Sequence, residues 1–455
     1  MVHCFKLHGD NVVYDSSGGS LHVCSDAVVG IIGAWSLERG AFDDEKMRGI
    51  EAEYGVAETR EAAGELLALI ADGQLFAPDE TEPDMDLLAG TYVFKSLCMH
   101  LAHDCNMRCA YCFAAEGSFG QKRELMNYET ACAAIDFIIA ASANRRNIEI
   151  DFFGGEPLLN FDVLKRTVQY ARNNEDKRGK KFRFTLTTNG ILLNEAIIKY
   201  VNANMDNLVL SVDGRREVND RMRQFPNGAG TYDYIIDRFK AVTEQREASW
   251  YIRGTYTAKN KDFSNDVLHL ADLGFDRLSV EPVISPPDPG LAFAPGDLTA
   301  LCEQYEKLAY AMNERAGEDR PFEFFHFNVD LEGGPCTARR IKGCGAGYEY
   351  AAVTPAGDIY PCHQFAGDDH FRLGNVREGI NEYDKTALFK HSNLYTKSGC
   401  VGCWAKFFCG GGCAANAWFY NKDINKPNEF YCALFRKRIE CALWLKCAGA
   451  LGNRE

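Results

Sequence analysis

The alternation of hydrophobic and polar positions divides the N-terminal part of the chain into strands, helices and a linker. Residues 4–15 and 19–25 alternate as strands, with turns at Gly9 and Asp10 and at residues 17–19. Apolar residues at helical spacing predict helices over 26–35 and 59–73. An acidic stretch with two prolines, near residues 78–90, is typical of a linker. These patterns predict a small module of strands followed by helices, which we place at residues 1–88.

From residue 91 the pattern changes to strands and helices in alternation. Strands are predicted at 91–101, 147–153, 182–188, 207–213, 249–256 and 277–283, with helices between them, for example at 127–143 and 194–204. Six strand–helix units in a row predict a parallel sheet, either open and doubly wound or part of a β/α barrel. In both architectures the reactive groups lie at the C-terminal ends of the strands.

Polar and glycine-rich residues gather at these strand ends. A loop with three cysteines follows the first strand, and the later strands end in or carry Gly154 to Pro157, Thr187 to Gly190, Ser211 with Asp213 and Gly214, Arg253, and Glu281. One such loop is explained by turn chemistry alone. Five of them beside a cysteine triad predict a single pocket.

Composition limits the functions that this pocket can have. The chain has 455 residues, enough for two to four domains, and its formal charge of −14 argues against nucleic acid or an anionic membrane as a partner. We find no signal peptide and no apolar run long enough to span a membrane, so we expect a cytoplasmic protein.

Its 18 cysteines should therefore be reduced thiols, many of them metal ligands. Seven scattered ones are expected to be small buried hydrophobes: Cys4, Cys24, Cys98, Cys132, Cys302, Cys441 and Cys447.

The triad Cys105, Cys109 and Cys112 has the spacing CxxxCxxC. A [4Fe–4S] cluster needs four thiolates, so three protein ligands leave one iron free, and we favour S-adenosylmethionine (SAM) as the ligand of that iron. An electron from the cluster would then break a C–S bond of SAM and give a 5′-deoxyadenosyl radical, and Tyr111 offers a face for adenine. The alternative is a zinc site completed by His103 or His100.

The segment GGEP at residues 154–157 has two interpretations. Alone it is a tight turn with a capping carboxylate. Next to the triad, backbone amides exposed by Gly154 and Gly155, with Glu156 as an acceptor, would fit an α-amino group.

These motifs resemble those of radical SAM enzymes, over about residues 91–320. The resemblance implies a partial (β/α)6 barrel, which we place at residues 89–320. It also implies that the three cysteines ligate the SAM-binding cluster, that GGE contacts the methionyl amine, and that Asn189, Ser211 and Asp213 line the SAM pocket; we add Arg253 to this cofactor-binding set. No protein side chain is required as a catalytic nucleophile, because the cluster and SAM carry the radical chemistry.

A second cysteine array lies in the C-terminal part, at Cys344, Cys362, Cys400, Cys403, Cys409, Cys413 and Cys432. A pair of zinc ribbons is one explanation, since CxxC is also a zinc spacing. The layout resembles a SPASM domain, placed at residues 321–455, which implies two auxiliary [4Fe–4S] clusters and three clusters in total. By that resemblance Cys400, Cys403, Cys409 and Cys432 ligate the outer cluster, and Cys344, Cys362 and Cys413 the inner one. Cys336 could complete the inner cluster, or its open iron could bind a substrate thiolate.

The N-terminal module resembles the PqqD-like, winged-helix-type element that captures a precursor's leader peptide by strand addition. A structural lid is the alternative. With the segments at residues 5–23 and 344–365, the whole chain resembles maturases of SCIFF peptides, which are short and cysteine-rich. This implies a thioether bond from a cysteine sulfur to a carbon of an acceptor residue, often threonine. The implied partners are the precursor peptide and an external electron donor of the flavodoxin or ferredoxin type.

Two kinds of rival function remain. Other SPASM enzymes oxidise, epimerise or form C–C bonds in peptides or proteins; the sulfatase-maturing ones carry Asp after the residue that Cys362 matches, where this chain has His363. Outside catalysis, the chain could be an iron–sulfur electron carrier or a peptide-binding scaffold. The intact triad and GGEP count against a carrier.

Overall fold

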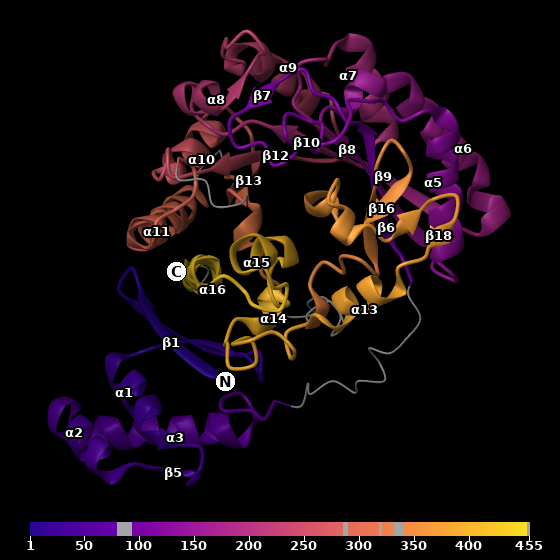
Figure 1. Cartoon of the computed structure of the whole chain (residues 1–455). Helices are drawn as coiled ribbons and strands as arrows, with labels where there is room; N and C mark the ends of the chain where they lie inside the picture. Colours follow the sequence, from indigo (N-terminus) through magenta and orange to yellow (C-terminus); the bar gives the residue numbers. More distant parts are fainter. Residues whose placement is uncertain (80–92, 285–289, 318–320, 332–340, 453–455) are drawn as a thin grey trace.

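The computed structural model describes residues 1–79, 93–284, 290–317, 321–331 and 341–452. Figure 1 shows a small N-terminal part, a curved arc of strands covered by helices, and a C-terminal part within the arc. Residues 80–92, most of the predicted linker, lie outside the described residues, and so does Cys336.

The N-terminal part is a three-stranded antiparallel sheet with three helices. The strands are β1 (Val2–Leu7), β2 (Asp10–Asp15) and β3 (Leu21–Cys24), in that order across the sheet; the helices are α1 (Asp26–Ala34), α2 (Asp44–Tyr54) and α3 (Val56–Ala71), with the short pair β4 (Trp35–Ser36) and β5 (Ala41–Phe42) after α1. His8 and Gly9 both have positive φ and form the two-residue turn between β1 and β2. The sequence analysis did not predict α2, in which no residue is fully buried and only a few apolar residues, such as Met47 and Ile50, pack against the small core.

This sheet is covered on both faces. Val13 packs with α1 and α3 in a small core, whereas Val12 and Tyr14 join the main core of the chain. On that side the ring of His3 stacks on Trp404 with centroids 4.0 Å apart, and Trp444 Nε1 donates a hydrogen bond to Asp10 at 2.9 Å. The N-terminal module therefore packs against the C-terminal part of the chain.

The middle of the chain is a partial barrel. Its parallel strands follow one another in chain order: β6 (Ser96–Ala102), β8 (Asn147–Gly154), β9 (Lys181–Thr188), β10 (Asn207–Ser211), β12 (Ser249–Tyr256), β13 (Arg277–Pro282) and the short β14 (Glu323–Phe324). All six predicted strands are confirmed. Because the order is sequential, the chain winds in one direction, as in a barrel and not as in a doubly wound sheet.

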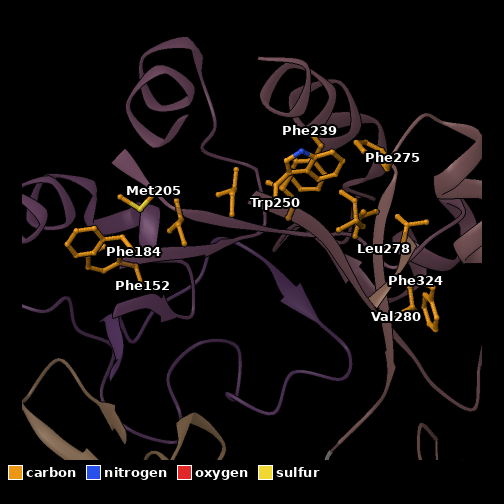
Figure 2. Packing of buried hydrophobic residues seen from close by; sticks show 14 of the residues in the cluster. Phe152, Phe184, Met205, Phe239, Trp250, Phe275, Leu278, Val280 and Phe324 are labelled. Atoms are coloured by element: carbon orange, nitrogen blue, oxygen red, sulfur yellow. The ribbon is translucent and has the colours of Figure 1, made fainter. Parts of the chain in front are cut away.

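Helices cover the outer side of this arc (Figure 1): α5 (Tyr128–Ala141), α6 (Phe161–Arg178), α7 (Glu195–Asn204), α8 (Arg216–Met222), α9 (Tyr232–Glu244), α10 (Phe263–Asp272) and α11 (Leu298–Arg315). Alternate strand residues such as Ile150, Phe152 and Phe184 are fully buried on this side, and Figure 2 shows this packing with Trp250 and Phe239. The intervening residues face the inside of the arc, where the polar chemistry lies.

The C-terminal part continues the same sheet. Strand β15 (Tyr350–Val353) pairs in parallel with β6, and β16 (Asp358–Tyr360), β17 (Gly374–Asn375) and β18 (Gly379–Ile380) extend it antiparallel. The helices are α13 (Tyr383–His391), α14 (Lys406–Cys409), α15 (Ala414–Asn421) and α16 (Glu429–Gly452). This extension brings the cysteine array to the open side of the barrel. No helix in the described parts of the chain is long and apolar enough to cross a membrane.

Candidate metal and cofactor site

A cavity lies at the C-terminal ends of the barrel strands. Of the predicted site residues, its walls include Cys105, Cys109, Tyr111, Cys112, Gly154, Gly155, Glu156, Asn189, Ser211 and Arg253. These residues come from five different strands and the loops that follow them, so the strand ends meet as the sequence predicts. Asp213 is the one member of the predicted cofactor-binding set that does not line the cavity.

The three-cysteine loop is held in place by a short strand pair. Strand β7 (Arg108–Cys109) pairs antiparallel with β11 (Arg223–Gln224), which sets Cys109 opposite Arg223. Burial raises the pKa of the Cys105 and Cys109 thiols to about 12, and neighbouring thiols of the triad add to both shifts. The three thiols are therefore close together, and a metal centre would supply the positive charge that converts them to thiolates.

The surroundings of Cys105 fit a cluster ligand. Its Sγ accepts a hydrogen bond from the backbone N–H of Met107 at 3.4 Å and lies 3.7 Å from Nδ2 of Asn189. N–H groups directed at sulfur stabilise thiolates and tune the potential of iron–sulfur clusters. The cavity wall thus carries three soft donors, and two N–H groups are directed at one of the sulfurs. An open space lies beside them, so these residues fit a cluster with one open iron.

The histidines of the zinc alternative pair with each other. His100 and His103 are buried, with Nδ1 of His100 3.0 Å from Nε2 of His103, and both rings pack on Phe119. Among the residues that the structure describes, no three His, Cys, Asp or Glu side chains are grouped so that they could hold a single metal ion.

The GGEP segment packs directly on the cysteine loop. The N–H groups of Gly155 and Glu156 donate to the carbonyls of Ala102 and Asp104, at 2.8 and 2.9 Å. The expectation that backbone amides are exposed at this segment is therefore wrong, because the loop uses them. A substrate ammonium in any case needs acceptors, and Glu156 supplies carboxylate oxygens at the cavity wall.

Glu156 joins the ends of β8 and β9. It is 1% exposed, and its carboxylate accepts hydrogen bonds from Leu158 N, Thr188 Oγ1 and Asn189 N at 3.0, 2.9 and 2.8 Å. Burial raises the pKa of this carboxyl to about 7, although the three hydrogen bonds oppose the shift. An ammonium ion at the wall would favour the ionised form further.

We expect Gly155→Ala to destabilise the fold by about 2–3 kcal/mol, because the added Cβ would lie 2.1 Å from the carbonyl oxygen of Asp104. Gly33→Ala, in α1 with open space around it, is the matched control and should stabilise by about 0.5–1 kcal/mol. Denaturant unfolding of both variants measures the difference. Equal stability of the two variants would contradict the close packing of the two loops.

Asp213 lies behind the cavity wall and organises it. It is fully buried, and its carboxylate accepts hydrogen bonds from Tyr111 OH at 2.8 Å, Arg223 Nε at 3.0 Å and Thr255 N at 3.0 Å. Tyr111 and Arg223 themselves line the cavity. Arg223 was not predicted from the sequence, because its place depends on the β7–β11 pairing between distant segments.

The neighbouring strands β12 and β13 carry a second ion pair. Arg253 Nη2 donates to Glu281 Oε2 at 2.7 Å, and both residues line the cavity. Burial alone would raise the pKa of Glu281, but Arg253, with His326 and Arg438 beyond it, lowers it to about 2. Glu281 is therefore a permanently ionised group in the wall.

The C-terminal part closes the cavity with His363 and Gln364. The ring of His363 lies near Phe113 and Phe153, and its Nδ1 is 3.1 Å from Tyr350 OH. The only sequence signal for these residues is that they follow Cys362. Their contact with the barrel depends on the pairing of β15 with β6.

The cysteine array forms two groups. Cys344 and Cys413 lie close enough to Cys362 to raise its pKa, and Cys344 also raises the pKa of Cys413. In the same way, Cys400 and Cys403 raise the pKa of Cys409, and Cys400 and Cys409 raise that of Cys432. Burial is the first cause in each case and brings the pKa of Cys409 to about 11 and of Cys432 to about 12. None of these three cysteines lines the cavity, but Cys362 directly precedes His363, which does.

Comparison with known proteins identifies the class to which this arrangement corresponds. Residues 99–252 match the radical SAM superfamily, and residues 344–404 match the SPASM iron–sulfur cluster-binding domain. The chain has an α/β radical SAM fold with a C-terminal SPASM domain. A radical SAM domain implies SAM and a [4Fe–4S] cluster, and a SPASM domain indicates auxiliary iron–sulfur clusters.

The relatives with assigned names include maturases. The mycofactocin maturase MftC of Mycolicibacterium smegmatis is 25% identical over 341 residues, which are 73% of this chain and 81% of MftC. The uncharacterized protein MJ0907 of Methanocaldococcus jannaschii is 32% identical over 189 residues, which are 41% of this chain and only 62% of MJ0907.

Solved structures share the fold. The native anSMEcpe structure with bound AdoMet has a TM-score of 0.66 at 20% identity and covers 78% of this chain and 99% of its own. The structure of Streptococcus suis SuiB bound to its precursor peptide SuiA has a TM-score of 0.50 at 16% identity and covers 92% of this chain and 95% of its own. At these identities the likeness shows the fold alone.

Proposed function

We propose that this protein is a maturase that forms a thioether bond within a short cysteine-rich peptide, from a cysteine sulfur to a carbon of an acceptor residue such as threonine. The observation that carries the proposal is the grouping of Cys344, Cys362 and Cys413, in which Cys362 directly precedes the cavity residue His363. Three thiols are one short of the four that a [4Fe–4S] cluster takes. A fourth position beside the reaction cavity is suited to a substrate thiol.

In this proposal the cavity residues bind the cofactors. Cys105, Cys109 and Cys112 ligate the SAM-binding cluster; Glu156, Asn189, Ser211, Tyr111 and Arg253, with the backbone of Gly154 and Gly155, bind and orient SAM. The bound cluster and SAM supply a radical that removes a hydrogen atom from the substrate. Asp213 acts from behind the wall, because it fixes Tyr111 and Arg223.

The two groups of the array have different tasks. Cys400, Cys403, Cys409 and Cys432 form a complete set of four and would ligate the outer cluster. Cys344, Cys362 and Cys413 would hold the inner one, completed by the peptide's thiolate or by Cys336. Binding at a metal converts a thiol of pKa near 8.5 to a thiolate at neutral pH, which is the form that the bond requires.

A peptide substrate is supported by SuiB, whose structure holds its precursor peptide SuiA. We assign leader capture to the N-terminal module, which we take as PqqD-like, with the domain limits 1–88, 89–320 and 321–455 given above. Strand β3 ends its sheet, and its Val23 is 41% exposed. A leader added beside β3 would extend the sheet and cover Val23.

A small flavin or iron–sulfur protein is the proposed electron donor.

Val23→Asp in the full chain should weaken binding of the precursor peptide roughly tenfold, because a charge replaces an apolar contact. Fluorescence anisotropy of a labelled peptide measures this. The control is Leu388→Asp on α13, where the side chain is 45% exposed. Unchanged binding to the Val23 variant would favour a structural lid. Point variants are preferable to deleting the module, because deletion would expose the C-terminal side chains that pack against its sheet, such as Trp404 and Phe408.

The experiment that tests the function uses the anaerobically reconstituted chain, SAM, a reductant and a synthetic peptide from a short cysteine-rich reading frame to be sought beside this chain's own. We expect the peptide to lose two hydrogen atoms per bond, one cysteine to resist alkylation, and fragmentation to stop within the linked ring. SAM cleavage with an unlinked but oxidised peptide would instead indicate chemistry of the sulfatase-maturing kind.

A further inference from the structure

The inside of the barrel is polar along its length. Closed eight-stranded β/α barrels are normally filled by layers of bulky branched side chains. Here the inward positions of three strands are Glu149, Asp151 and Phe153 on β8, Arg183, Thr185 and Thr187 on β9, and Tyr251, Arg253 and Thr255 on β12, and none of them is fully buried.

Two cavities open onto this interior from opposite ends. The upper one is the site described above, with Phe153, Thr187 and Arg253 in its wall. The lower one lies at the amino ends of the strands, and Glu149, Thr185 and Tyr251 are among its lining residues. On β9 and β12 the inward residues that line the two cavities are two positions apart, and on β8 they are four positions apart. At most one inward residue of each strand therefore lies between the two cavities.

Asp151 lies in the layer between the cavities. It stands opposite Thr185 in the β8–β9 register, and Thr187, two positions further along β9, is near enough to lower the pKa of its carboxyl group. Its Oδ1 is buried and has no hydrogen-bond partner among the residues that the structure describes. A carboxyl oxygen without a partner inside a barrel is costly, so this residue is hard to explain as a purely structural one.

We propose that Asp151 carries a proton from the reaction cavity to solvent through the barrel interior. The S–H bond of the peptide's donor cysteine breaks and its proton passes to the Thr187 hydroxyl, which simultaneously gives its own proton to the Asp151 carboxylate. Asp151 then releases the proton to water in the lower cavity and is ionised again. This inference rests on the proposed cross-linking function, and it holds whether or not the thiol binds an iron.

The charges around Asp151 suit this role. Burial raises its pKa from 3.8 to about 7, while Arg253 and Thr187 lower it and Glu149 raises it. The other titratable groups that interact with it are Cys98 on β6, Tyr350 on β15 and Tyr251 on β12. A carboxyl group with a pKa near the working pH can both accept and release a proton.

The test compares the pH dependence of cross-linking by the wild-type chain and by Asp151→Asn, with the same peptide, SAM and reductant. The acceptor is the ionised carboxylate, so the wild-type rate should rise with pH through about 7. The Asp151→Asn variant should not show this rise with pH, and its cross-linking rate should be about 10²-fold lower than that of the wild type. Asp151→Glu should restore part of the pH dependence and part of the rate. SAM cleavage without peptide and the iron content should not change. Asp162→Asn, an exposed position on α6, is the control.

A second measurement does not depend on turnover. The folded pKa of Asp151 lies above its unfolded value of 3.8, so its contribution to stability is present below pH 3.8 and is lost as the pH rises through about 7. The Tm of Asp151→Asn relative to wild type should therefore increase between about pH 4 and pH 7. A pH-independent Tm difference, or an Asp151→Asn variant with the wild-type pH profile, would overturn the inference. Absence of any cross-link with the wild-type chain would instead refute the proposed function.

Discussion

A chain with Cys105→Ala, Cys109→Ala and Cys112→Ala will cleave no SAM above background. It will also contain about four fewer iron ions than the roughly twelve expected for three clusters in the reconstituted wild type. The reason is geometric: these three thiols share one wall of the cavity, and the seven thiols of the array form two separate groups. Quantifying 5′-deoxyadenosine and iron per chain gives both results.

The matched control replaces three cysteines outside all groups, by Cys24→Ala, Cys132→Ala and Cys302→Ala. These are partly buried on β3, α5 and α11, so iron content and SAM cleavage should stay within about twofold of wild type. SAM cleavage retained by the triad variant would mean that the cofactor site is elsewhere.

The second large effect is expected for Cys413→Ala. This change removes one thiol from the group beside the cavity and should cost at least about 10²-fold in cross-linking, because the peptide's thiol loses the metal centre that would deprotonate it. SAM cleavage without peptide should change less than about threefold, since Cys413 does not line the cavity that would hold SAM. Product peptide and 5′-deoxyadenosine are measured in the same reactions.

Two outcomes limit this interpretation. A parallel loss of SAM cleavage and cross-linking in Cys413→Ala would show that the group only supports the fold. Cys336→Ala separates the two forms of the inner cluster: a loss of iron and activity means that Cys336 closes the cluster, whereas unchanged iron leaves a position for the peptide.

The sequence predicted the barrel well, because each strand is a short run whose apolar residues alternate with polar ones. In β8, Ile148, Ile150 and Phe152 pack under the helices and Asp151 and Phe153 face inward, so the strand end and its polar residues could be placed. The rule that site residues follow parallel strands then located most of the cavity wall.

The sequence could not predict features that depend on pairing between distant segments. Arg223 reaches the cavity only because β11 pairs with β7, and His363 only because β15 joins β6. Likewise, the backbone amides of GGEP were expected to be free, but their partners are carbonyls of a loop about fifty residues earlier. Helix α2 has no fully buried residue, and its apolar positions, such as Met47 and Ile50, are few among charged ones.

The most direct test of the central claim follows a hydrogen atom from the peptide. The peptide is synthesised with deuterium on the side-chain and α carbons of its acceptor residues and is incubated with the reconstituted chain, SAM and a reductant. The proposed function predicts deuterium in the 5′-deoxyadenosine that forms, in step with linked peptide. Abundant 5′-deoxyadenosine without deuterium, together with a peptide of unchanged mass, would contradict it.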